Sequence, residues 1–582
     1  MISMKHWSRQ FLLASLASGA SELTAAPTIA PAYASRLSVS SIQPGTGTVT
    51  QMAWGPGGRL YAARSEGGAV SFAYDAATGQ LSDQRPAAAI SGLGIAFLPA
   101  RQEMYLTSPG VLWRLTDADG NGGWGSDPGD TQVALVAGIP GELHTVDQLQ
   151  VKGSTLWVGI GIRTWDGGTG TTAFASEGES AYGGTICWIQ DLSAVPSVPD
   201  AARVHGSMSG AALQSDATPF TTAAAGKLVV HSAGTRNPYG LALDAAGDLF
   251  FTNNYNRAET RGDGSSQVHG PNDFPGPDLS RDVHDQFFKA AAGADYGFRN
   301  DNWRGVRDPA IKARILDLAD PQHLAVRSIT PDNLYATDPN YLQLHDPAAP
   351  VGLGPSSSSV GVDFWYHPAL PVNLYGAAFV ARWNPIIGES SPGTRSIAYS
   401  DLVAVDPAGG TVRRVATGFF FPLAVLADRN GHLLVSDWGA ETVTTLRLLP
   451  PPDTDGDGLP DDWMQFHFGH STPRADDASR AADDADGDGQ SNAAEYVAGT
   501  SPRDAGSLLR ILGIVRDAQG ARVRFASVAG RRYRLEFSPG LVPSSWSTVT
   551  AGLWGTGNPV EIEEPIPPAV TARFYRVGIE GL

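Results

Sequence analysis

One short pattern recurs between residues 49 and 437 and limits the fold more than any other feature of the sequence. Each copy is an apolar stretch, a turn rich in Gly, Asp or Asn, and a second apolar stretch, as in VTQMAWGPGGRLYAA at residues 49–63. Alternating apolar residues bounded by such turns are typical of β-hairpins. Further copies begin near residues 92, 146, 240, 360 and 423.

Six hairpin units predict an all-β protein. One unit cannot bury both of its faces alone, so neighbouring units have to stack. We therefore expect a six-bladed β-propeller over residues 35–449. A β-sandwich is the competing all-β architecture, and six regular units favour the propeller. The 68 Gly and 41 Pro residues supply the backbone angles that so many turns require.

The chain of 582 residues is too long for one hydrophobic core. The N-terminus has the pattern of a signal peptide over residues 1–34: basic Lys5 and Arg9, a short apolar stretch, and small residues at 32–34. It predicts export to the periplasm or exterior of a bacterium. No apolar run is long enough for a transmembrane helix. The alternating strands after residue 505 predict a small β-sandwich over residues 505–582. Cys187 is the single cysteine, which excludes an intramolecular disulfide.

Residues 450–504 carry an unusual share of the charge. Residues 451–506 contain 13 acidic and 3 basic side chains, a net charge of -10 out of -18 for the whole chain. An acidic protein without a basic face is not expected to bind nucleic acid. Such a local excess of carboxylates needs a cation, and we interpret this segment as calcium-binding repeats.

The calcium loop with the stronger pattern is DADGDGQSNAAE at residues 484–495. Carboxylates at alternate positions, a Gly for the sharp turn, a backbone carbonyl and a bidentate Glu form the ligand set that calcium prefers. The predicted ligands are Asp484, Asp486, Asp488, Gln490 and Glu495.

A second loop begins at DTDGDG, residues 453–458. Its predicted ligands are Asp453, Asp455 and Asp457, and Asp461 compensates for Met464, which stands where the loop needs a carboxylate. The two loops resemble thrombospondin-type-3 or dockerin-like repeats, which implies a structural role and attachment to a cell surface or matrix. The similar stretch at residues 117–122 is interpreted as a turn.

Three further stretches resemble the soluble quinoprotein glucose/sorbosone dehydrogenases. They are GELH at residues 141–144, GTRNPYG at residues 234–240 with DQ and DYGF after it, and the two closing hairpin units. The resemblance implies pyrroloquinoline quinone (PQQ) and calcium as cofactors and a sugar or related alcohol as substrate. It implies that His144 is the general base and that Arg236 and Asn237 hold the quinone. The lysine and paired arginines with which that family grips its cofactor are not evident here, and Arg382 and Arg395 are the candidates to replace them.

The same stretches depart from the pattern of that family. Arg163 stands where an acidic residue is common, the next acid is Asp166, and no lysine follows Lys312. These departures leave a non-catalytic propeller that binds carbohydrate or a surface partner as the alternative function. A calcium-dependent hydrolase, with Asn253, Asn254 and Asp285 around a metal, is a third.

Overall fold

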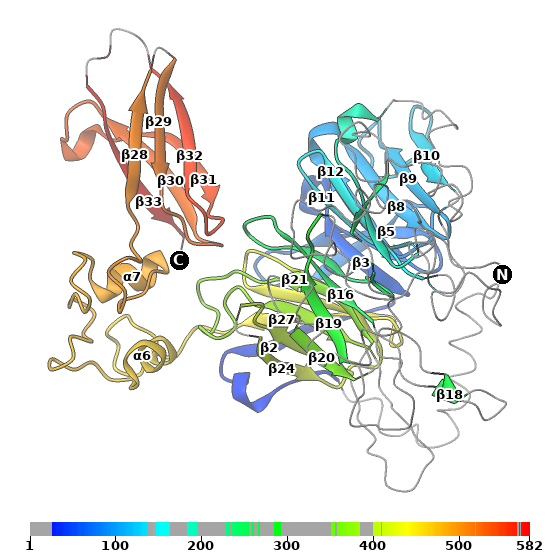
Figure 1. Ribbon diagram of the computed structural model, residues 1–582, viewed down its shortest axis with the longest axis horizontal. Coiled ribbons are helices and arrows are strands. Elements are labelled where there is room, and N and C mark those ends of the chain that lie inside the picture. The colour runs from blue at the N-terminus through cyan, green and yellow to red at the C-terminus, as the bar shows by residue number, and fades with distance from the viewer. Residues whose placement is uncertain are drawn as a thin grey trace, which may run out of the picture.

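The computed structural model describes residues 26–137, 139, 144, 146–162, 183–195, 228–232, 234–254, 259–260, 266–267, 284–292, 351–355, 358–383, 400–408, 410–517, 519–566, 570 and 572–581 (Figure 1). These residues form mainly β-strands joined by turns, which confirms the prediction of a mostly β protein. Within these ranges no helix has the length and apolar character needed to cross a membrane.

Among the described residues between 28 and 448, six antiparallel sheets have four or five strands each. The first sheet contains β3 (Val49–Trp54), β4 (Leu60–Arg64), β5 (Ala69–Tyr74) and β6 (Leu81–Ala88). The second contains β7 (Ile95–Leu98), β8 (Glu103–Ser108), β9 (Val111–Thr116) and β10 (Thr131–Ala137). The third contains β11 (Val146–Lys152), β12 (Thr155–Ile160), β13 (Thr185–Ile189) and β14 (Val229–Ser232).

The other three sheets follow the same pattern with two additions from the N-terminal segment. The fourth sheet contains β15 (Leu241–Leu243), β16 (Leu249–Asn253), β19 (His284–Lys289) and β20 (Val351–Pro355). The fifth contains β21 (Ser359–Phe364), β22 (Ala378–Arg382), β23 (Asp401–Val405) and β24 (Val412–Thr417), with β1 (Thr28–Ile29) added. The sixth contains β25 (Pro422–Ala427), β26 (His432–Asp437) and β27 (Thr442–Leu448), with β2 (Leu37–Pro44) added. A separate pair joins β17 (Glu259–Thr260) to β18 (Ser266–Gln267).

The first strands of the six sheets contact one another in chain order, from β3 through β7, β11, β15 and β21 to β25, and β25 contacts β3. Glycine permits this close approach. A Cβ atom on Gly240 would lie 2.1 Å from the carbonyl oxygen of Val360, and one on Gly361 would lie 2.3 Å from that of Leu423. No side chain fits at such a contact between backbones.

Polar side chains also join sheets that are not neighbours in sequence. The Gln51 side chain donates to the Leu149 carbonyl and accepts from the Ile95 and Leu149 amides, at 2.8–3.0 Å. Gln148 Nε2 donates to the Thr50 carbonyl at 2.9 Å. Both glutamines are buried, and every such bond satisfies a backbone group that the ring would otherwise leave unpaired.

The N-terminal segment closes the last sheet. Strand β2 pairs with β27 from Leu37 opposite Leu448 to Pro44 opposite Thr442. Strand β1 pairs with β24, and Tyr33 between them is only 6% exposed and packs in the largest apolar cluster. Cleavage after residue 34 would remove these contacts, and the signal peptide over residues 1–34 stays a prediction. Residues 1–25 lie outside the described part.

The C-terminal third contains two short helices and two three-stranded sheets (Figure 1). Helices α6 (Asp461–Phe468) and α7 (Asn492–Ala498) lie in the predicted calcium segment. One sheet contains β28 (Ile511–Arg516), β29 (Gly520–Phe525) and β32 (Val560–Pro565), and the other β31 (Ser547–Trp554), β30 (Arg532–Ser538) and β33 (Phe574–Glu580). The sequence predicted the strands but neither helix.

Candidate functional site

The candidate site lies where the third and fourth sheets meet. His144 stands just before β11, and its backbone amide donates to the Ile162 carbonyl at 3.1 Å. A Cβ atom on Gly161 would lie 2.3 Å from His144 Cβ and 2.4 Å from Asn237 Oδ1. The structure therefore brings His144 and Asn237, 93 positions apart in the sequence, together beside Gly161.

The Arg236–Asn237 turn is held by a buried amide. Asn253 Oδ1 accepts from the backbone amides of Arg236 at 3.0 Å and Asn237 at 3.2 Å. Arg236 Nη1 donates to the Asn254 carbonyl at 3.4 Å, and the Asn254 amide donates to the Asn237 carbonyl at 3.1 Å. Asn253 and Asn254, singled out from sequence for a hydrolase metal, thus position the Arg-Asn pair.

This region concentrates buried polar atoms without a hydrogen-bond partner among the residues that the structure describes. Native interiors leave few such atoms, so a group of them marks a place where a ligand or water completes the bonding. Four neighbouring segments contribute such atoms, among them His144 Nε2, Asp147 Oδ2, Thr235 Oγ1, Asn237 Oδ1, Tyr239 Oη, Asn253 Nδ2, Asn254 Oδ1 and Gln286 Oε1.

Burial also shifts the ionisation of the site. Burial, with a further contribution from the Arg236 charge, lowers the pKa of His144 well below its ordinary value, so the imidazole is neutral at neutral pH. Burial raises the pKa of the Asp147 carboxyl well above its usual range. Burial, reinforced by Asp147, raises the pKa of Tyr239. The site thus combines a neutral base with one permanent cation.

Asp147 and Tyr239 were missed by the sequence argument. Asp147 is 1% exposed and Tyr239 is 5% exposed. Asp147 stands three residues after His144 at the start of a strand, and an acid at a position expected to be buried was a signal available in the sequence. Tyr239 lies inside the quoted GTRNPYG stretch but was not given a role.

Arg382 has contacts that do not suit a cofactor ligand. Its Nε and Nη2 atoms donate to the two carboxylate oxygens of Asp401 at 2.7 and 2.6 Å, and Nη1 donates to the Leu353 carbonyl at 2.9 Å. Both side chains of the pair are buried. The guanidinium neutralises a buried carboxylate, and the role of Arg382 in holding the quinone stays a prediction. Arg163, Asp166 and Lys312 lie outside the described residues.

The loop at residues 484–495 brings its predicted ligands together. Carboxylate oxygens of Asp484, Asp486 and Asp488 lie within 4.8 Å of one another. Glu495, in α7, is fully buried, and neither of its carboxylate oxygens has a hydrogen-bond partner within the described residues. Burial, followed by the charges of Asp486, Asp488 and Asp484, raises the pKa of Glu495 to about 7.

The position of Gln490 agrees with a backbone ligand. Its amide donates to Asp488 Oδ1 at 2.7 Å, and its side-chain Nε2 donates to the Leu509 carbonyl at 3.4 Å. The side chain is therefore engaged elsewhere, as expected if only the main-chain carbonyl of Gln490 serves the loop.

The loop at residues 453–461 has the same local geometry. Asp453, Asp455 and Asp457 also cluster within 4.8 Å. Burial, followed by Asp455, Asp453 and Asp461, raises the pKa of Asp457, which places Asp461 beside the cluster. Met464 is buried in an apolar cluster with Leu459 and Trp463, so its side chain packs where the first loop has a carboxylate.

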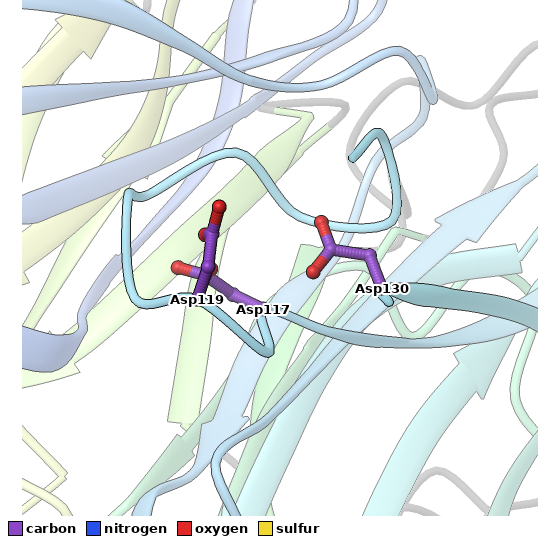
Figure 2. Close-up of side chains that lie close together, drawn as sticks. All are labelled: Asp117, Asp119 and Asp130. Carbon is purple, nitrogen blue, oxygen red and sulfur yellow. The ribbon is translucent and has the colours of Figure 1, made fainter. Parts of the chain in front are cut away.

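A third acidic cluster was not predicted. Figure 2 shows Asp117, Asp119 and Asp130, whose carboxylate oxygens approach within 4.8 Å. Asp117 accepts from the amides of Gly120 and Gly122, both at 2.8 Å, which agrees with the interpretation of residues 117–122 as a turn. Asp130 returns to this turn from the start of β10 and accepts from the Ala118 amide at 2.8 Å.

No protein-family model and no curated protein matches the chain. Three solved structures show a general likeness. The holo PQQ domain of pyranose dehydrogenase from Coprinopsis cinerea has 14% identity and a TM-score of 0.45, over 74% of this chain and 99% of that one. A putative oxidoreductase (glucose dehydrogenase) from a Thermus species has 18% identity and a TM-score of 0.37, over 71% and 99%. A gluconolactonase from Xanthomonas campestris has 12% identity and a TM-score of 0.32, over 73% and 95%.

Proposed function

We propose that the body of this protein is a six-bladed β-propeller that binds PQQ and oxidises a sugar or a related alcohol. The support comes from the chain's own residues, chiefly the buried polar atoms without partners that gather around Gly161. Six consecutive sheets of four or five strands, whose first strands contact one another in a ring, support the blade number.

The donor set fits a tricarboxylate quinone. Arg236 offers a permanent cation, which suits a carboxylate. Asn237 Oδ1 and Asn253 Nδ2 have no hydrogen-bond partner among the described residues, so both side-chain amides can bond to a ligand. Burial raises the pKa of Asp147, which favours the neutral carboxyl and weakens its repulsion of such a ligand. When bound, the quinone would supply the two-electron acceptor that no side chain provides.

His144 has the properties of the general base in this proposal. Its lowered pKa keeps Nε2 or Nδ1 unprotonated at neutral pH, so the ring accepts the hydroxyl proton of a substrate. Because the main-chain amide of His144 is fixed to the Ile162 carbonyl, the ring stays beside Asn237. Arg236 opposes protonation of the ring and so preserves the base.

Calcium binding at residues 450–504 is also part of the proposal, with one ion in each acidic loop. The fully buried Glu495, with its two unpartnered oxygens, carries this part of it. We place two structural regions after the propeller, the calcium segment over residues 450–504 and the β-sandwich over residues 505–582. Export and surface attachment remain proposals from the sequence.

The proposal is tested by cofactor binding. We expect calorimetry of the full chain with calcium and PQQ to give saturable binding, and Arg236→Ala to abolish it. Arg85→Ala is the matched control, since this arginine forms only an exposed pair with Asp83. Absence of binding at high micromolar PQQ would contradict the dehydrogenase and leave the non-catalytic binding propeller.

A further inference from the structure

Four aromatic side chains form a cluster that the proposed chemistry does not use. Trp383, Phe420, Phe421 and Trp438 are each partly exposed, and we call them the aromatic patch. The ring centroids of Trp383 lie 5.0 Å from Phe421 and 5.6 Å from Trp438, and those of Phe420 and Phe421 lie 4.5 Å apart. Large rings that contact one another and still face solvent are unusual for a core and typical of a binding surface.

The patch lies at the same end of the sheets as the candidate site. Trp383 and Trp438 directly follow β22 and β26, the second strands of the last two sheets, and Phe420 and Phe421 directly precede β25, a first strand. His144 likewise precedes a first strand, β11, and Asn254 follows a second strand, β16. Because adjacent strands are antiparallel, starts of first strands and ends of second strands meet at one end.

A continuous series of contacts joins the two regions. The Trp383 amide donates to the Ser358 carbonyl at 3.1 Å, and the next residue, Ser359, donates its amide to Asp285 Oδ2 at 2.9 Å. The residue after Asp285, Gln286, pairs with Asn253, which holds the Arg236–Asn237 turn. The patch and the candidate site are therefore connected through directly bonded residues at the same end of the sheets.

The rings are held by their surroundings. The Asp437 carboxylate accepts from the amides of Phe420 at 2.6 Å and Phe421 at 2.9 Å. A Cβ atom on Gly439 would lie 2.4 Å from the Phe421 ring and 2.6 Å from the Phe420 ring. Trp438 Nε1 donates to Ser65 Oγ at 3.0 Å, which ties the patch to the first sheet. A surface fixed before binding loses little entropy when a ligand arrives.

We propose that the aromatic patch binds the sugar rings of an oligosaccharide and so makes a saccharide chain, rather than a free monosaccharide, the substrate class of the neighbouring site. The C–H face of a pyranose ring is apolar and positively polarised, which complements the negative face of an aromatic ring. Each side of a stable protein interface contributes roughly 20–30 residues, or about 800 Å². The aromatic patch has four half-buried side chains and is therefore too small for a protein partner. The statement about the substrate rests on the proposed function, but the binding itself does not require a quinone.

The test is calorimetry of the full chain without PQQ, using cellohexaose, maltohexaose and glucose as probes. We expect at least one hexaose to bind and glucose to bind much more weakly, because a chain covers several rings at once. Trp438→Ala and Trp383→Ala should each weaken hexaose binding by about tenfold. Trp438→Phe, which keeps a ring but loses the bond to Ser65, should retain most of the affinity.

The matched control is Trp546→Ala, because Trp546 is also partly exposed but lies in the C-terminal region, with the Arg576 guanidinium 4.4 Å from its ring. Its hexaose affinity should equal that of the unchanged chain, and thermal unfolding establishes that each variant is folded. Absence of hexaose binding, or equal affinity in the patch variants, overturns the inference even if PQQ binds. Hexaose binding without PQQ binding supports the patch and contradicts the dehydrogenase. Concentration-dependent dimers in sedimentation that disappear in Trp438→Ala would assign the patch to self-association and also overturn it.

Discussion

At the residue scale, the candidate site depends on groups whose ionisation burial has changed. Burial lowers the pKa of His144 and raises the pKa of Asp147, and the Arg236 side chain lies among buried amides. A carboxyl group buried this deeply is stable mainly in its neutral form unless a cation pairs with it. Arg236 contributes a positive charge beside His144, which suits an anionic cofactor.

His144 is expected to act as a base over a wide pH range. Because its pKa lies well below the ordinary value, kcat/KM for sugar oxidation should stay flat around neutral pH and fall only in more acidic solution, as the ring becomes protonated. His144→Gln should lower kcat by about 10² to 10⁴-fold while PQQ binding measured by calorimetry persists. Loss of cofactor binding in this variant would instead give His144 a structural role.

Glu495 predicts a pH-dependent stability in the metal-free protein. Its folded pKa of about 7 is above the value of an unfolded glutamate, so the folded state holds the extra proton and loses stability as pH rises from about 5 to about 8. Calcium should remove this dependence, and Glu495→Gln should flatten it without metal. Differential scanning fluorimetry across this pH range, with chelator or with calcium, measures the pH dependence for the unchanged chain and for Glu495→Gln. Asp476→Asn is the control, because Asp476 is an exposed acid outside the predicted ligand sets.

At the scale of elements, local patterns were predictable and distant pairings were not. Each hairpin from β3–β4 to β25–β26 follows from alternation around a turn, which a short window of sequence contains. The pairing of β2 with β27 joins residues separated by some 400 positions, and nothing local specifies it. The same reason explains why the ion pair of Arg382 with Asp401 was missed, because ion pairs depend on the assembled sheets.

The N-terminal segment gives a direct test of the body's boundary. A chain that begins at residue 35 loses β1 and the buried Tyr33, so we expect its free energy of unfolding to fall by about 3 kcal/mol relative to a chain that begins at residue 27. Urea unfolding followed by circular dichroism gives the difference. Tyr33→Phe in the longer chain keeps the ring and should cost much less; equal stability of the two truncations would show that the segment contributes nothing.

At the scale of the whole molecule, the C-terminal region is joined to the body by several contacts. Arg36 pairs with Asp462 at the start of α6, and the Tyr375 hydroxyl donates to the Ala529 carbonyl. The Arg429 guanidinium lies 4.2 Å from the Trp554 ring centroid. Because three separate contacts join the body to the C-terminal region, the calcium segment and the terminal sheets should unfold together with the body when calcium is bound.

Calorimetric scans test this coupling. We expect one cooperative transition with calcium, and separate transitions after Tyr375→Ala combined with Arg429→Ala, since both changes remove contacts to the terminal sheets. Arg510→Ala is the control, because this side chain is exposed. Two transitions in the unchanged, calcium-loaded chain would mean that the regions are independent.

The pairing of β2 with β27 has a consequence for synthesis. Because the first long strand must wait for residues 442–448, the ribosome delivers almost the entire body before the ring can close. Until then, β2 and the open edge of the last sheet stay available to other chains. A circularly permuted gene that places residues 37–44 directly after residue 448 would make this pairing local and should shorten the vulnerable interval.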